Sequence, residues 1–258
     1  MKKHDFTANP APANRKAGAR KRGRATTLVL ALLGCALPAR PALAQQVLVQ
    51  ANVADDTVKT SFGPNRRYFG HLYVGYGLVA GPAAAGAGLR FGLPSSELRL
   101  GGRLKRRLSQ TLALNLDLGY AYQRYALAQN AQKTVPSPAL HRSESLARHQ
   151  LYSEASLRLN AGRRGNTVGR YLDLLAGGGW VAATAHSADD EPGPGIDAVE
   201  TIERGLPYLN PWTADLGTRL GWDRYALTAR YRVGAVFRTG YGWPELPRWR
   251  VGVEVGLF

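Results

Sequence analysis

The chain has 258 residues, and 34 lysines and arginines against 18 aspartates and glutamates give it a net charge of +16. Nine basic residues lie in the first 44 positions, where Asp5 is the one acidic residue, so 25 basic and 17 acidic residues remain downstream. The downstream arginines stand singly and form no basic run interleaved with aromatic residues, which argues against a nucleic-acid partner. No window of about 18 apolar residues predicts a transmembrane helix.

Residues 1–44 are typical of a signal peptide. A basic stretch at 15–24 precedes an apolar stretch at 26–36, and Ala42-Leu43-Ala44 is a small-x-small cleavage site before Gln45. We therefore expect the chain to be exported and this segment to be removed.

The only cysteine, Cys35, lies within this leader, so the downstream chain has no disulfide and no cysteine-based metal site. The stretch Leu32-Leu33-Gly34-Cys35 also resembles the lipobox of bacterial lipoproteins, in which Cys35 would be acylated and would begin the mature chain. Ordinary cleavage after Ala44 is the favoured interpretation, and both routes imply export.

Residues 45–67 lack sustained alternation and contain Asp55-Asp56 and Gly63-Pro64, so we expect a periplasmic lead-in there. The clearest pattern of the chain follows at Thr111–Tyr122, where leucines and tyrosines alternate with small and polar residues that include Asn115 and Asp117. A period of two places these sets on opposite faces of a β-strand. An apolar face of about ten residues that ends in aromatic residues is typical of a membrane-spanning strand.

The same alternation recurs eight times, so the sequence predicts an all-β fold: an eight-stranded antiparallel transmembrane β-barrel over residues 68–258. The expected strands are residues 68–80, 97–105, 111–127, 146–160, 169–183, 209–222, 225–238 and 248–258. Consecutive glycines at 177–179 indicate a bulge or close packing within the fifth strand.

The lengths of the links between these strands support the same architecture. The links at 106–110, 161–168 and 223–224 are short, whereas the other four are longer, and 184–208 is the longest expected loop. Outer-membrane barrels combine an even number of strands with short periplasmic turns and long outer loops.

Aromatic residues are expected at both membrane interfaces, where their apolar rings and polar edges match the headgroup boundary. Those expected to face outward near the outer rim are Tyr120, Tyr122, Trp180, Trp212, Phe237 and Trp249. Those expected near the inner rim are Tyr68, Trp222 and Tyr225.

A leader, eight amphipathic strands and the terminal Phe258 together resemble the small eight-stranded outer-membrane β-barrels of Gram-negative bacteria, which include OmpA-like, OmpX-like and PorT-like proteins. The resemblance covers residues 68–258. It implies the cell outer membrane as location, with the lipid bilayer, lipopolysaccharide and the barrel-assembly machinery as partners. In such families the assembly machinery recognises an aromatic end of the last strand. Phe258 is similar to that signal, although it lies off the parity of Val251–Leu257.

The inward parity carries many charged residues. They are Arg99, Arg103, Asp117, Arg148, Glu154, Arg158, Asp173, Asp215, Arg219, Arg230, Arg232, Arg250 and Glu254. A barrel of eight strands is just wide enough to be filled by side chains, and buried charges must pair. We therefore expect an ion-pair network that plugs the interior. The alternative is a narrow pore or small-ligand site with surplus positive charge.

Two motifs in the expected outer loops suggest chemistry only weakly. His141 and Ser143 loosely resemble the His-x-Ser of outer-membrane lipid A deacylases, but a nucleophilic serine needs a histidine held in place by a third group. His186 and the acidic residues at 189–191 and 197 offer oxygen ligands for calcium without a defined spacing. Neither motif predicts a catalytic residue, a metal or a cofactor.

The expected function is therefore non-enzymatic: a structural or binding barrel that acts through outer loops 128–145 and 184–208 on an extracellular partner. A PorT-like role in secretion or assembly is the alternative. It would use residues 45–67 and a periplasmic protein partner, or a lipid-facing contact. A lipid A-modifying enzyme and a narrow pore are further alternatives.

Overall fold

The computed structural model of the protein describes residues 60–162, 165–190 and 199–258, so the expected leader and most of the lead-in lie outside it. Within these ranges the chain is all-β, and no helix is long and apolar enough to cross a membrane. The strands are β1 (Tyr68–Ala80), β2 (Ser96–Arg107), β3 (Leu112–Ala126), β4 (Ser143–Ala161), β5 (Arg170–Asp190), β6 (Val199–Arg204), β7 (Trp212–Trp222), β8 (Tyr225–Arg232) and β9 (Trp249–Leu257). A 3₁₀ turn, η2 (Thr239–Tyr241), precedes β9.

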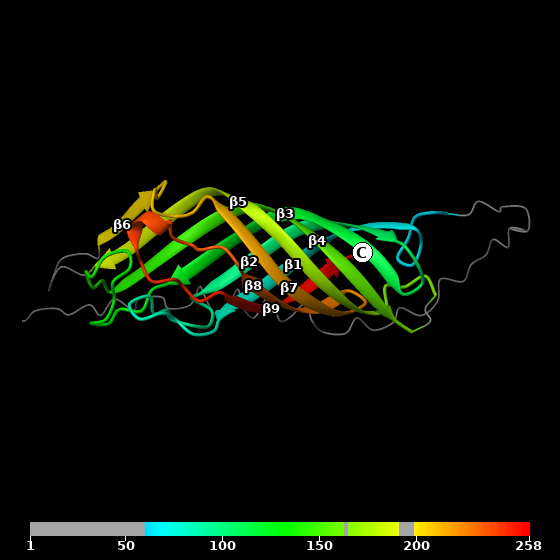
Figure 1. The fold of residues 1–258 in the computed structure, drawn as a ribbon, viewed down its shortest axis with the longest axis horizontal. Coiled ribbons are helices and arrows are strands. Elements are labelled where there is room, and N and C mark those ends of the chain that lie inside the picture. Colours follow the sequence, from blue (N-terminus) through cyan, green and yellow to red (C-terminus); the bar gives the residue numbers. More distant parts are fainter. Residues whose placement is uncertain (1–59, 163–164, 191–198) are drawn as a thin grey trace, which may run out of the picture. The chain divides into compact units, whose positions relative to one another are not determined.

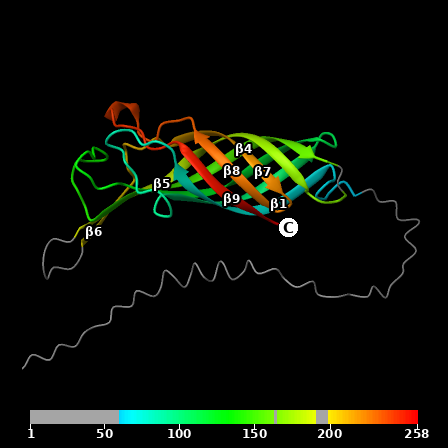
Figure 2. The ribbon, with the colours of Figure 1, turned by 90° about the horizontal axis from the view of Figure 1, so that it is seen from below.

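Eight strands form a closed ring of antiparallel pairs, in the order β1, β2, β3, β4, β5, β7, β8 and β9. The ring closes where β9 pairs with β1, from Leu72 opposite Leu257 to Ala80 opposite Trp249. Figure 1 shows the strands running obliquely side by side, and Figure 2 shows β1 and β9 next to β8 and β7. The prediction of eight antiparallel strands is confirmed, and the first strand has the expected bounds.

The alternation in the sequence appears as alternation of burial around the ring. Along β3, Leu114, Leu116 and Leu118 are exposed on the outer surface, whereas Asn115 and Asp117 are buried. The interior of the ring is thus polar and its outer surface is apolar, the reverse of a soluble β-sandwich.

Links of two lengths divide the ring into two ends. At the short-link end lie the turns β2–β3, β4–β5 and β7–β8; at the long-link end lie residues 81–95, 127–142, 205–211 and 233–248. Trp180 pairs with Trp212 at the long-link end, and Trp222 pairs with Tyr225 at the short-link end. All four rings are exposed on the outer surface.

The expected loop at 184–208 is wrong in part. β5 continues to Asp190, and its last residues pair with β6, from Ala185 opposite Arg204 to Asp190 opposite Val199. This β5–β6 hairpin extends beyond the ring (Figure 1). A bulge precedes it, because His149 faces Ala183 whereas Gln150 faces Val181, which leaves Ala182 as the extra residue.

The glycines at 177–179 have a different cause from that bulge. A Cβ on Gly177 would lie 2.6 Å from the carbonyl oxygen of Ser153, and a Cβ on Gly179 would lie 2.8 Å from that of Leu151. Neighbouring backbones approach too closely there for any side chain.

The seventh strand is shorter than predicted, and Phe237 does not face outward. β8 ends at Arg232, and the following residues fold across the long-link end, where Phe237 is 3% exposed and its ring lies 5.4 Å from that of Trp243. It belongs to an apolar plug made by that end of the ring and its links. The plug consists of Val79, Ala87, Leu89, Tyr125, Leu127, Val135, Leu146, Leu206, Leu209, Val236, Phe237 and Leu246.

Candidate functional site

The thirteen charged residues expected inside are all buried, at most 6% exposed. Twelve of them have ion-pair partners, and together with Glu97 these form what we call the interior network. Glu97 was missed from the sequence. It pairs with Arg99 on its own strand and with Arg250 of β9. Glu97 lies two residues before Arg99 on the same strand, so the alternation could have predicted that it also faces inward.

Arg219 of β7 lies at the centre of the network. Its guanidinium contacts carboxylates from four other strands: Glu154 at 2.7 Å, Asp173 at 2.8 Å, and Asp117 and Glu254 at 3.2 Å each. One cation thereby links β3, β4, β5 and β9 across the interior. Several carboxylates around one guanidinium supply the hydrogen bonds that offset the cost of burying its charge.

Two ion pairs join residues that lie directly opposite each other on neighbouring strands. Arg103 Nε and Nη2 donate to both oxygens of Asp117 at 2.7–3.0 Å, and Arg158 donates to both oxygens of Asp173 at 2.7 and 2.8 Å. This bidentate geometry is the strongest form of a charge-assisted hydrogen bond. The Arg158 guanidinium also lies 3.5 Å from the ring centre of Tyr171.

Like Glu97, the other two glutamates of the network each hold more than one guanidinium. Glu154 accepts from Arg230 at 3.1 Å and from Arg99 at 3.4 Å, and Glu254 lies 2.7 Å from Arg103. Cations and anions are thus interleaved in this part of the interior.

Aromatic side chains fill the space beside these charges. Tyr73 and Tyr152 share a hydroxyl hydrogen bond of 2.7 Å, with the Arg103 guanidinium 4.5 Å from the first ring and that of Arg99 3.7 Å from the second. Such cation–π contacts add to the ion pairs. Gly119 leaves the room for them, since a Cβ there would lie 2.5 Å from the Tyr152 hydroxyl.

Near the long-link end, the network holds the plug in place. Arg250 pairs with Asp215, while Arg232 donates to the Tyr125 hydroxyl at 2.6 Å and to Glu245 at 2.7 Å. Glu245 was not expected to take part, because it lies in a link whose path the strand pattern does not define.

Arg148 is the exception among the thirteen. It is 0% exposed, yet none of its three guanidinium nitrogens has a hydrogen-bond partner within the described part of the chain. The ion pair expected for it is not formed.

Beyond the ring, Glu144 at the start of β4 lies in a polar cluster that the sequence did not indicate. It accepts from Gln129 Nε2 and His186 Nε2 at 2.8 Å each and from Lys133 at 2.5 Å. Burial opposes ionisation, but these hydrogen bonds outweigh it and lower the pKa of Glu144 below 4.5. The bond to Glu144 raises the pKa of His186 above 6.5, and Glu203 of β6 lies 3.5 Å from its other nitrogen.

The His141 and Ser143 motif meets the last residues of β5, at the end of the β5–β6 hairpin that lies away from the ring. His141 Nδ1 lies 2.9 Å from Asp190, whereas the Ser143 hydroxyl donates to Asp189 at 2.5 Å, so each is engaged with a different carboxylate. Among the described residues, no group of three or more histidine, cysteine or acidic residues could hold a metal ion. Glu191 and Asp197 of the expected calcium set lie outside them.

Phe258 follows β9 and turns toward the short-link end of the ring. Its ring is 41% exposed and makes edge contacts with Phe69 at 5.4 Å and His71 at 5.0 Å.

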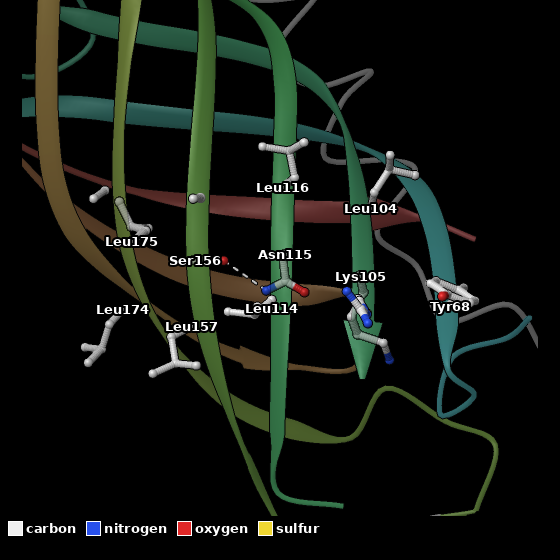
Figure 3. A pocket seen from close by; sticks show the side chains of 13 residues that line it. Tyr68, Leu104, Lys105, Leu114, Asn115, Leu116, Ser156, Leu157, Leu174 and Leu175 are labelled. Atoms are coloured by element: carbon white, nitrogen blue, oxygen red, sulfur yellow. Dashed lines mark hydrogen bonds between the residues drawn. The ribbon is translucent and has the colours of Figure 1, made fainter. Parts of the chain in front are cut away.

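The outer surface carries shallow apolar grooves between strands. Figure 3 shows one, with leucines of β2, β3, β4 and β5 around it and the Asn115–Ser156 hydrogen bond of 2.9 Å between two of its strands. The leucines that line it are Leu104, Leu114, Leu116, Leu157, Leu174 and Leu175.

Comparison with known proteins adds no relative: no protein-family model matches the chain, and neither does any curated protein.

Proposed function

We propose that the protein is an outer-membrane β-barrel whose interior is closed by ion pairs and whose long links carry its contacts with a partner. The observation that carries this proposal is the combination of an exposed leucine and valine face with buried charges around a closed ring. Soluble monomers rarely expose an apolar surface of that extent. Acyl chains are the solvent in which such a face is stable, and a closed ring leaves no unpaired strand edge in lipid.

The positions of the aromatic residues support a membrane of ordinary thickness. Ten residue steps separate Trp212 from Trp222 along β7. At about 3.3 Å per residue, and with the 35–45° tilt usual in membrane barrels, the two rings are about 25 Å apart along the barrel axis. That matches the apolar band of outer-membrane barrels. The exposed residues of β7 in this interval are Ala214, Leu216, Thr218 and Leu220.

We propose that the barrel does not conduct and does not catalyse a reaction. The interior network and the apolar plug both occupy the space that a pore would need. His141 and Ser143 each hold an aspartate rather than a shared substrate position.

The β5–β6 hairpin is the part best suited to a partner protein. All six residues of β6 are exposed, including Val199 and Ile202, and one edge of β6 is paired with β5. An edge strand with apolar side chains can accept another strand from a partner.

Two experiments test the proposal. The expressed protein should appear in the outer-membrane fraction and migrate differently on gels before and after boiling; recovery as a detergent-free soluble monomer would contradict it. Shortening the β5–β6 hairpin to a two-residue turn should then abolish the proposed contact with the partner protein. The gel shift of the folded protein should stay intact. Indifference to this deletion would instead favour a secretion- or assembly-accessory role through residues 45–67.

A further inference from the structure

Arg148 lies in a buried cluster of hydrogen-bond donors; we call this cluster the donor pocket. Gln123 faces it across the β3–β4 pair, and Gln150 follows it on the same inward face of β4. The side-chain amide nitrogens of both glutamines, like all three guanidinium nitrogens of Arg148, have no partner in the described chain. Arg250 Nε is a further unpaired donor in the same half of the interior.

Thr213 lies beside the other end of the Gln150 amide. Its hydroxyl is 3.4 Å from the carbonyl oxygen of Gly179 and 3.5 Å from Gln150 Oε1. The group that this pocket lacks is therefore an acceptor, since every unpaired atom named is a donor.

The charge around Arg148 is not balanced by a carboxylate of its own. The charged groups acting on it include Arg232 and Arg250, both cations, and the one acid among them, Asp215, is engaged by Arg250. Glu154 follows Arg148 by six residues on β4, which places the two backbone positions about 20 Å apart along the strand. Its carboxylate is held by Arg219 and Arg230. A buried guanidinium without a counter-charge is costly, and one monovalent anion would neutralise it.

Water has little access to the pocket from the long-link end. Leu146 and Tyr125, the next inward residues on β4 and β3, belong to the apolar plug and are fully buried. We propose that Arg148, Gln123 and Gln150 form a binding site for one small monovalent inorganic anion such as chloride. The site depends on the geometry of the ring interior and not on where in the cell the protein resides.

The test compares urea unfolding of the refolded protein in sodium chloride and in sodium gluconate at equal ionic strength, since gluconate is a much larger monovalent anion than chloride. Chloride should shift the unfolding midpoint of the wild type upward and should broaden the chlorine-35 resonance. Arg148→Gln should lose both effects. Arg90→Gln, which changes an exposed arginine of the 81–95 link, should retain them.

A chloride effect of equal size in the wild type and in Arg148→Gln would overturn the proposal and would mean that water or a rotated amide satisfies the guanidinium. Where Arg148→Gln fails to fold, crystals of the wild type grown with bromide give the answer without a variant. Anomalous density beside Arg148 supports the site, and its absence at high bromide occupancy elsewhere overturns it.

Discussion

Arg219 of β7 donates to Asp117 of β3 at 3.2 Å, although β4 and β5 separate the two strands in the ring. The same guanidinium reaches Glu254 of β9 on the other side. A single side chain therefore connects opposite walls of the interior.

Arg219→Met should destabilise the fold strongly, because it leaves Asp117, Glu154, Asp173 and Glu254 without their shared cation. Removing one partner of a buried ion pair costs about 3–5 kcal/mol. The free energy of unfolding, measured by urea titration of tryptophan fluorescence in detergent, should fall by that amount. Arg90→Gln is the exposed control and should stay within about 0.5 kcal/mol of the wild type. Equal stability of the two variants would show that the network contributes little.

Gly119→Ala should destabilise the barrel through overpacking. Its Cβ would lie 2.2 Å from the Leu100 carbonyl oxygen and 2.5 Å from the Tyr152 hydroxyl. Inserting a methyl group into such a site costs about 1–3 kcal/mol. The temperature at which the folded gel band disappears should drop. Gly102→Ala is the matched control, because its nearest neighbour would be a Leu72 methyl at 3.7 Å, and it should behave like the wild type.

The β5–β6 hairpin should loosen as the pH rises. The hydrogen bond to Glu144 raises the pKa of His186 in the folded protein above 6.5. The stabilisation of the hairpin by His186 is therefore complete below pH 6.5, and it is lost as the pH rises through that raised pKa. The lowered pKa of Glu144 has the opposite sign, since its contribution is complete above 4.5 and is lost on acidification.

A spin label at Ile202→Cys on β6 can report this change by electron paramagnetic resonance. Its mobility should be lowest near pH 5.5, between these two limits, and should increase on going to about pH 9. The variant His186→Gln should remove the increase at high pH. A wild-type label that is equally mobile across this range would show that the contact does not restrain the hairpin.

The protein should be silent in planar lipid bilayers. With Arg219, Arg103 and Arg230 locked onto carboxylates and the apolar plug across one end, no continuous water path is expected. A large porin inserted under the same conditions is the positive control. Steady anion-selective current steps from the purified protein would contradict the plugged interior and favour the pore alternative.

Much of the ring could be predicted because one physical signal, alternation of leucine with polar residues, sets the bounds of β1 through β4 to within three residues. The same signal fails beyond the ring. Residues 184–190 continue β5, although His186, Ser187 and Asp189 do not give the strand an apolar face. A hairpin outside the ring does not lie between an apolar and a polar environment, so its sequence need not alternate. Phe237 was placed outward because its parity fits, but the chain leaves the strand at Val233.

The membership of the interior network was also readable from parity, whereas its pairing was not. The odd or even position of a residue along a strand predicts whether its side chain points into the ring or outward. It does not predict which of the other strands lies opposite that side chain. Arg219 contacts four carboxylates, whereas Arg148 contacts none in the described part of the chain. This difference depends on the stagger of the strands and on the bulge at Ala182, because a register shift of one residue changes which side chains face each other across the ring.

The central claim, that the leucine face meets lipid and the charged face is enclosed, can be tested by depth-dependent fluorescence quenching. A fluorophore at Leu116→Cys, in vesicles with brominated acyl chains, should be strongly quenched and should emit as in an apolar solvent. The same fluorophore at Leu140→Cys, on an exposed site of the 127–142 link, should be unquenched by these lipids. A Leu116 label that emits as in water and ignores the brominated chains would contradict the account.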